Sequence, residues 1–386
     1  MARSKDQQVR GGAAEAAPAA APTLTERRDG FAYGYWMNCE CGEASYLSPE
    51  DYFEGENAAR MRCEHCGASI HFGPAVAALR DRDDPALRDD IVPTLAWYHT
   101  STTADWPSPS YAAQFAKALS WVERDFGISR DRYIAKETSK ALHVGTYETA
   151  IENMLRRMDD QADGGSQFYL YRVALALDAG RINAGYRDEN HAVASDISIR
   201  ELEEEGLDAV RYLNVHEAMG VLSLAVRPQV IAAVQMIPIP IQGLSVAIDP
   251  AIFRTDVEAL ARVTGELEAA DEAAAAIIDS RDRRMMELGA RPDPTGLAKR
   301  AGKLRHQYYD RWRQLEDHLG ERCLPNASGA IRHDFNEAMA SWRSAQPQTD
   351  GHDFVERYQC LAALIERSES VIDAVGAQEW RVAQPR

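Results

Sequence analysis

The spacing of apolar residues changes along the chain. Before residue 250, apolar runs are short and rich in aromatic and β-branched residues, as in 167–177 (QFYLYRVALAL), which predicts strands. From residue 255 onward, apolar residues recur at spacings of three and four, as in Leu304, Tyr308 and Trp312, which predicts helices with one apolar face each. The pattern predicts an α+β protein whose last part, residues 255–376, is a helical bundle.

Residues 91–250 mix the two kinds of pattern. The segments 94–102 and 140–146 predict strands, and each ends in small polar residues. A helix is predicted over 147–158, with Thr146 as its N-cap. A short acidic helix and further strands follow, so we expect residues 91–250 to form one α+β domain.

Composition narrows the classes of partner. The chain has 386 residues with a formal net charge of -17, so it carries no overall basic footprint for nucleic acid. No run approaches the ~18 consecutive apolar residues of a membrane span, so we expect no membrane partner. Residues 1–30 are rich in Ala and Pro and resemble neither a secretion signal nor a core, which predicts a disordered tail. The close pairing of four of the six cysteines fits metal binding in a reducing compartment better than disulfides, so we expect a cytoplasmic protein.

Four of the six cysteines form two close pairs in the predicted module of residues 31–80. They are Cys39 and Cys41, followed by Gly42, and Cys63 and Cys66, followed by Gly67. Thiolates favour tetrahedral zinc, and a glycine after each pair allows the sharp turn that aims backbone N–H groups at the sulfurs. The spacing predicts a structural zinc site resembling a zinc ribbon.

Two alternatives remain open for this module. His65 or His71 lies close enough in the sequence to replace one cysteine as a ligand, and the four thiols are also compatible with reduced cysteines that bind no metal. The isolated Cys323 and Cys360 are expected to be ordinary thiols of the helical part.

A candidate carboxylate stands in the stretch 208–226 (DAVRYLNVHEAMGVLSLAV). Glu217 lies just before an apolar strand, with Asn214 three residues upstream, so its carboxylate is placed to point into a cleft. The plainer interpretation is a surface Glu in a loop, which the residues of this stretch alone favour.

Two motifs resemble the ADP-ribosyltransferases of the diphtheria-toxin type. Tyr212 to Glu217 resembles their Tyr-x-Asn-x-x-Glu stretch, and Tyr98-His99 followed by small hydroxyl residues resembles their NAD-pocket strand. The resemblance covers about residues 94–235. It implies a split-sheet domain that binds NAD between two small sheets, with Glu217 as the catalytic acid and His99 holding a ribose hydroxyl.

The same resemblance assigns further contacts with NAD. Nicotinamide would pack on His143 or Tyr147, and Val215 makes arginine an unexpected acceptor, because arginine-modifying members carry Glu or Gln at that position. The remaining residues expected around the dinucleotide are Thr100, Ser101, Gly145, Thr146 and Asn214.

The function expected from the resemblance is mono-ADP-ribosyl transfer from NAD to RNA, DNA or protein, in a toxin or anti-phage effector. The ribbon would select this acceptor, and the helical domain would offer a site for a protein partner. His143 keeps NAD hydrolysis and RNA 2'-phosphate transfer open as alternatives, because a histidine in this strand resembles the phosphotransferase branch. A catalytically inactive zinc-ribbon adaptor or nucleic-acid-binding protein is the non-enzymatic alternative. No G-x-G-x-x-G fingerprint supports a dehydrogenase.

Overall fold

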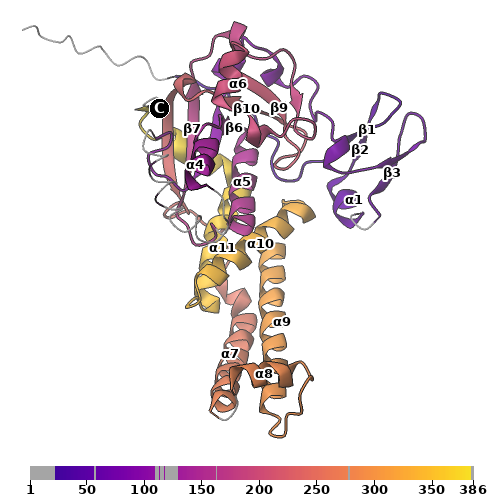
Figure 1. The fold of residues 1–386 in the computed structure, drawn as a ribbon, viewed down its shortest axis with the longest axis vertical. Helices are drawn as coiled ribbons and strands as arrows, with labels where there is room; N and C mark the ends of the chain where they lie inside the picture. The colour runs from indigo at the N-terminus through magenta and orange to yellow at the C-terminus, as the bar shows by residue number, and fades with distance from the viewer. Residues whose placement is uncertain are drawn as a thin grey trace, which may run out of the picture.

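Two four-stranded sheets, two two-stranded sheets and a series of helices make up the described part of the protein in this computed structural model (Figure 1). The structure describes residues 22–55, 58–108, 113, 117, 129–161, 163–276 and 279–383. The expected mixed α+β class, with a cysteine cluster near the N-terminus and a helical C-terminal part, is confirmed.

The first sheet has the strand order β6-β10-β9-β8. β6 (Leu142–Val144), β10 (Leu222–Val226) and β9 (Ala209–Leu213) are antiparallel, and β8 (Arg187–Asp188) runs parallel to β9. Every residue of β9 and β10 is buried, because the sheet is covered on both faces. The short helix α6 (Ile199–Glu204), capped by Ser198, precedes β9.

The second sheet has the order β12-β11-β7-β5 and is antiparallel throughout. It contains β5 (Trp97–Ser101), β7 (Phe168–Leu175) and β11 (Ile231–Ile239). Its last strand, β12 (Arg381–Val382), comes from the C-terminal end of the described chain, so the chain returns to this sheet after the helices.

The two sheets meet where β5 passes the end of β6. Tyr98 and Gly145 exchange backbone hydrogen bonds there, at 2.8 and 3.0 Å. α4 (Arg130–Thr138) precedes β6, and α5 (Tyr147–Asp160) starts directly after this junction. The hydroxyl of Thr146 accepts from the Thr149 N–H, which confirms the predicted N-cap.

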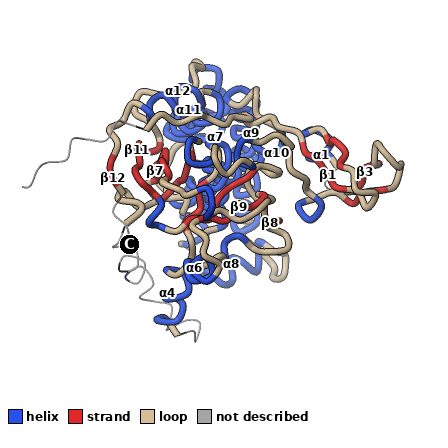
Figure 2. The backbone as a smooth tube through the Cα atoms, turned by 90° about the horizontal axis from the view of Figure 1, so that it is seen from above, coloured by secondary structure: helices blue, strands red, loops and turns tan. Residues whose placement is uncertain are grey.

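The cysteine module consists of two β-hairpins and one helix. β1 (Tyr35–Asn38) pairs with β2 (Ala44–Leu47), and β3 (Arg60–Arg62) pairs with β4 (Ser69–His71). Between them lies α1 (Pro49–Glu54), which Ser48 caps. Figure 2 shows this module on the side of the molecule opposite β7, β11 and β12.

Residues 22–30 pack against the main body, although the sequence placed them in the disordered tail. Thr25 pairs with Leu95 through a backbone bridge. Arg27 is buried, forms an ion pair with Asp84 at 3.3 Å and lies over the Trp97 ring. Apolar periodicity gives no signal for such a segment, because an ion pair between Arg27 and Asp84 anchors it. The rest of the predicted tail, residues 1–21, lies outside the described residues.

The helical part is not an isolated bundle. α7 and α9 run side by side away from the sheets, with α8 near their far end (Figure 1). α10, α11 and α12 return to the main body, and one continuous apolar core joins residues of the cysteine module, α5 and these helices. The bounds are α7 (Arg254–Ala275), α8 (Ser280–Glu287), α9 (Leu297–Cys323), α10 (Gly329–Ala345), α11 (Gly351–Glu366) and α12 (Ser368–Gly376).

Among the described helices, none combines the length and apolar character needed to cross a bilayer.

Candidate functional site

A cavity of about 70 Å³ lies at the junction of the two sheets, between β5, the end of β6, α5 and the loop that connects β9 to β10. Five of the residues predicted to surround NAD line it. They are His99, Thr100, His143, Gly145 and Glu217. Folding therefore brings together side chains that lie more than a hundred residues apart in the sequence.

Glu217 reaches this cavity from the β9–β10 loop, residues 214–221. The residue as a whole is 7% exposed. One carboxylate oxygen accepts hydrogen bonds from Asn153 at 3.0 Å and from Arg156 Nε at 2.7 Å. Asn153 and Arg156 are three residues apart on α5 and therefore share one face of the helix. The carboxylate is held by one amide and one guanidinium rather than left to solvent.

The β9–β10 loop is fixed from two sides. Glu152 on α5 accepts the Ala218 N–H and also the hydroxyl of Tyr33 at 2.9 Å. Ala218 has a positive φ of 45°, a conformation that costs an L-residue about 1 to 2 kcal/mol. These contacts hold the loop in a conformation that it would not adopt readily by itself.

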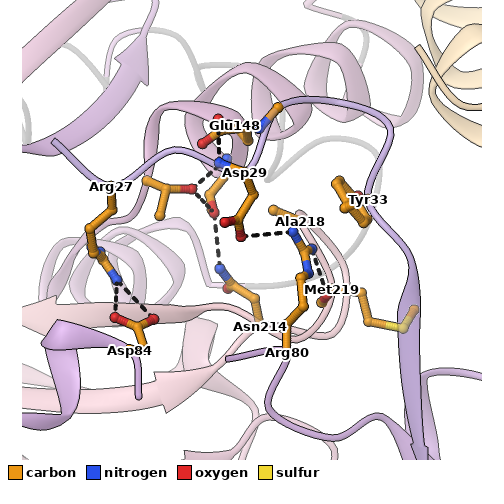
Figure 3. A network of polar contacts seen from close by, with 12 residues as sticks. Arg27, Asp29, Tyr33, Arg80, Asp84, Glu148, Asn214, Ala218 and Met219 are labelled. Atoms are coloured by element: carbon orange, nitrogen blue, oxygen red, sulfur yellow. Dashed lines mark hydrogen bonds and ion pairs between the residues drawn. The ribbon is translucent and has the colours of Figure 1, made fainter. Parts of the chain in front are cut away.

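Arg80 supplies the other support of the loop. Its guanidinium donates to the Met219 carbonyl at 2.7 Å and to the Asp29 carboxylate at 2.9 Å (Figure 3). The N-terminal segment and the end of the cysteine module thus meet at the loop that carries Glu217.

His99 is oriented by one backbone contact. Its Nδ1 lies 2.9 Å from the carbonyl oxygen of His143. Because a carbonyl only accepts, Nδ1 carries the proton and Nε2 is left as an acceptor. The Trp106 ring stacks on the imidazole at 4.2 Å. Burial, helped by the charge of Arg157, lowers the pKa of His99 to about 3.

His143 leaves one polar atom without a partner. Its Nδ1 lies 3.1 Å from the Tyr212 hydroxyl, whereas its Nε2 is buried and has no hydrogen-bond partner among the described residues. Burial lowers the pKa of His143 to about 4. A neutral imidazole with one free nitrogen beside a cavity fits a ligand that supplies a hydrogen bond.

Both histidines are expected to stay neutral at physiological pH. In NMR spectra, the ring signals of His99 and His143, assigned through His99→Asn and His143→Asn, should not titrate between about pH 5 and about pH 8. Because folding lowers both pKa values, the folded protein binds fewer protons than the unfolded chain between about pH 4 and about pH 6.5, so stability falls as the pH drops through that interval. Free histidine in the sample provides a reference near ~6.5. A midpoint near neutrality for either ring would contradict the burial of this site.

Gly145 and Thr100 both line the cavity, and each is closely packed. A Cβ atom at Gly145 would lie 2.6 Å from Ser223 Oγ and 2.7 Å from Thr149 Cγ2, so only glycine fits without a shift. Thr100 is 1% exposed and donates its hydroxyl to the Ala150 carbonyl. Its side chain is already used to dock α5, which leaves its backbone for any ligand.

Four predicted residues do not line the cavity. Tyr147 is fully buried, donates its hydroxyl to the Leu364 carbonyl at 2.6 Å and packs edge-on against Tyr98, so it anchors α5 to α11 and is not placed to stack on nicotinamide. Thr146 caps α5, and Ser101 accepts the Thr103 N–H. Asn214 donates to Ser223 at 2.7 Å and so stiffens the β9–β10 loop from behind the cavity.

Sequence reasoning missed several residues of the site. Asn153 and Arg156 lie in the predicted helix 147–158 without a motif of their own, and Trp106 stands in a loop without a motif. The signal that could have found the first two is their spacing of three on the helix that starts at the sheet junction. The other lining residues that were missed are Tyr98, Val144, Thr149, Ala150, Tyr212 and Ser223.

The four predicted metal-ligating cysteines converge. Cys39 and Cys41 lie in the β1–β2 turn, Cys63 and Cys66 lie in the β3–β4 turn, and all four sulfurs are within 4.8 Å of one another. The Sγ atoms of Cys39 and Cys66, and those of Cys41 and Cys63, are 3.7 Å apart. A tetrahedron with Zn–S bonds of about 2.3 Å has edges of about 3.8 Å, so this set of sulfurs can hold a metal ion such as zinc.

The surroundings of the sulfurs agree with a four-thiolate site. Gly42 and Gly67 adopt positive φ values of 91° and 72°, as the predicted sharp turns require. The ring of His65 lies 3.3 Å from the Ala44 carbonyl, and His71 is not part of the cluster of potential ligands. Four thiolates would complete a zinc coordination shell, which favours a structural role over a catalytic one.

Comparison of the chain with protein-family models, with curated proteins and with solved structures finds no match. The geometry of the site itself comprises a fixed carboxylate, two neutral imidazoles and a glycine without room for a Cβ atom, all around one cavity.

Proposed function

We propose that the protein is an NAD-dependent mono-ADP-ribosyltransferase in which Glu217 and His99 act on the nicotinamide ribose. The observation that supports this function most directly is that His99 from β5 and Glu217 from the β9–β10 loop line one cavity between two small sheets. The motifs that resemble the diphtheria-toxin type of transferase thus occupy one place in the fold.

Glu217 would stabilise the charge that develops during the reaction. The bond between nicotinamide and the anomeric carbon breaks, and its electron pair leaves with nicotinamide. The ribose then carries positive charge until a lone pair of the acceptor forms the new bond and the acceptor releases a proton. A carboxylate beside the ribose stabilises this oxocarbenium-like state, as in glycoside hydrolysis.

His99 would orient the sugar. With Nδ1 bonded to the His143 carbonyl, its Nε2 accepts a hydrogen bond from a ribose hydroxyl. His143 Nε2 would form a hydrogen bond with a ligand group such as the carboxamide of nicotinamide, which offers both a donor and an acceptor, and this would satisfy an atom that has no partner among the described residues. Both roles need neutral imidazoles, and burial supplies them.

Substrate entry would require Arg156 to leave Glu217. The cavity of about 70 Å³ is small beside the ~300 Å³ of a typical ligand pocket. The Arg156 side chain is 41% exposed, whereas that of Glu217 is 9% exposed, so the arginine has the freedom to move. In its new position the guanidinium would be available to the pyrophosphate of NAD.

The test is incubation of the full-length protein with adenine-labelled NAD and cell extract. Transfer of label to macromolecules is expected, and separate treatment with protease, DNase and RNase identifies the class of acceptor. Release of nicotinamide without transfer would favour NAD hydrolysis, with water as the acceptor. If neither label transfer nor nicotinamide release occurred, the proposal would be wrong.

RNA 2'-phosphate transfer is the second candidate, and the position of His143 favours it. His143 lines the cavity with a free ring nitrogen, and Arg156 and Arg157 lie at the same end of α5. Removal of a 2'-phosphate from an RNA oligonucleotide in the presence of NAD would separate this activity from ADP-ribosylation of a macromolecule.

We further propose that the metal is zinc and that it supports the module without taking part in the chemistry. The module contributes Tyr33 and Phe31 to the core that surrounds α5, so its folding and that of the Glu217 loop are connected.

A further inference from the structure

A second cavity, of about 380 Å³, lies on the other side of the β9–β10 loop from the candidate NAD site. We call it the aromatic pocket, because the cysteine module lines one wall with rings. These are Tyr33, Tyr35, Tyr52, Phe53 and Phe72. The opposite wall is formed by α5, the loop and the start of α10.

The rings of the aromatic pocket form an ordered surface. Tyr35 and Tyr52 stack with centroids 4.0 Å apart, and Phe72 lies 5.7 Å from Tyr52. Phe53 is 40% exposed and packs against Gly329 at the start of α10. Tyr33, Tyr35 and Phe72 are buried, so the partly exposed Tyr52 and the exposed Phe53 are the rings of this wall that can contact a planar cation.

Acidic side chains complete the aromatic pocket. Glu152 is 8% exposed and lies at its inner end, where burial raises the pKa of the carboxyl group to about 8. At the rim, burial raises the pKa of Asp334 to about 6; the neighbouring His333 opposes this rise, and the charges of Asp159 and Glu337 add to it. A cation would relieve both the cost of ionising Glu152 and the repulsion at the rim.

The chain already uses the same chemistry beside the pocket. The guanidinium of Arg80 lies 3.7 Å from the centre of the Tyr33 ring (Figure 3). Tyr33 also donates its hydroxyl to Glu152. One tyrosine therefore combines a guanidinium on its face with a carboxylate at its edge, which is the arrangement that a second guanidinium would meet inside the pocket.

The two cavities share a wall. His216 and Met219 line the aromatic pocket, and Glu217, which lies between them in the loop, lines the candidate NAD site. A group bound in the aromatic pocket is consequently only one loop away from the carboxylate. No described residue lies in both linings.

We propose that the aromatic pocket binds the guanidinium of an arginine side chain of a partner polypeptide. A planar, weakly hydrated guanidinium stacks on tyrosine and pairs with carboxylates, which matches both walls. A nucleic acid fits less well, because its phosphates would approach the acidic rim around Asp334 in a protein of net charge -17.

Binding of arginine in the aromatic pocket would also affect which acceptor is modified, and this consequence rests on the proposed function. If Glu217 acts in ADP-ribosyl transfer, the arginine in the aromatic pocket positions a neighbouring residue of the acceptor at the candidate NAD site. The arginine is recognised and is not itself the modified residue, because it lies on the far side of the loop from the Glu217 carboxylate.

The test measures binding alone, without NAD. The full-length protein is titrated with the peptide acetyl-Gly-Gly-Arg-Gly-Gly-amide and with the same peptide carrying citrulline, a neutral isostere of arginine, by calorimetry or NMR. Binding of the arginine peptide should be at least about tenfold tighter, and its affinity should fall as salt is raised.

Two variants locate the site. Asp334→Asn should weaken binding roughly three- to tenfold, and Tyr52→Leu should weaken it by a similar factor through loss of cation–π attraction. Asp310→Asn removes an exposed acid of α9 outside the pocket and should leave the affinity unchanged. Three results would overturn the proposal. The two peptides could bind equally, Asp334→Asn and Asp310→Asn could have equal effects, or a short RNA could bind more tightly than the arginine peptide. Because the assay contains no NAD, a failure of the arginine peptide to bind would not contradict the transferase proposal. Likewise, absence of transferase activity would not contradict binding of arginine in the aromatic pocket.

Discussion

Glu217→Gln is expected to lower the rate of ADP-ribose transfer by roughly 10²- to 10³-fold, the size of effect seen when one preorganised electrostatic contact is removed from an active site. The amide keeps the shape of the side chain and a hydrogen-bond acceptor, but it carries no charge to stabilise the developing cation. The measurement is initial velocity of label transfer and of nicotinamide release at saturating NAD.

The matched control for this variant is Glu258→Gln, which removes the charge of an exposed acid on α7. Its rate should equal that of the wild type. Both variants should unfold within a few degrees of the wild type, because Glu217 is bonded to an Arg156 side chain that can turn to solvent. A Glu217→Gln protein that retains full activity would exclude this carboxylate from the chemistry.

Loss of the metal is expected to have the largest effect on stability. Cys63 is 3% exposed and belongs to the same core as Phe31, Tyr33 and Tyr147. Structural zinc binding is worth on the order of 10 kcal/mol in small modules, so Cys63→Ala should abolish the metal and unfold the module. We expect about one zinc ion per chain in the wild type, and a chelator should lower its melting temperature.

Cys360→Ala is the control for metal loss, since this thiol lies on α11 outside the cluster. It should retain zinc. The arrangement of the core also predicts that Cys63→Ala reduces transferase activity, because Tyr33 and Arg80 no longer support the Glu217 loop. A Cys63→Ala protein with unchanged zinc content, or a wild type insensitive to chelation, would contradict the metal assignment.

The parts of the fold that were predictable are those with a local signal. Two cysteine pairs with trailing glycines were enough to predict that four sulfurs meet, because turn geometry and thiolate chemistry act over a few residues. Strand β7 and helix α5 were predicted within two residues of their bounds for the same reason. His99 and Glu217 were brought together through the order of motifs, without any signal for the distance between them.

The failures involve tertiary contacts. Tyr147 was expected at the nicotinamide, but the rotation of α5 about its axis turns it to the core, and that rotation is set by α11, more than two hundred residues away. Arg156 belongs to no sequence motif, and only the fold shows that Glu217 lies beside it. Strand β12 is only two residues long, so no periodicity could reveal it. Likewise, the apolar faces of α10 and α11 indicate that these helices pack against other parts of the chain. They do not indicate that these parts are α5 and the cysteine module.

The central claim is that the cavity between the sheets binds NAD, and calorimetric titration of NAD into matched glycine variants tests it most directly. Gly145→Ala places a Cβ 2.6 Å from Ser223 Oγ in the cavity, whereas at Gly180 the nearest atom is 3.5 Å away and an added Cβ is accommodated. We predict that the wild type and Gly180→Ala bind NAD with equal affinity and that Gly145→Ala, checked for an unchanged zinc content and circular dichroism spectrum, binds it at least about tenfold more weakly. NAD that fails to bind the wild type at millimolar concentration, or that binds Gly145→Ala as tightly as the wild type, would contradict the account.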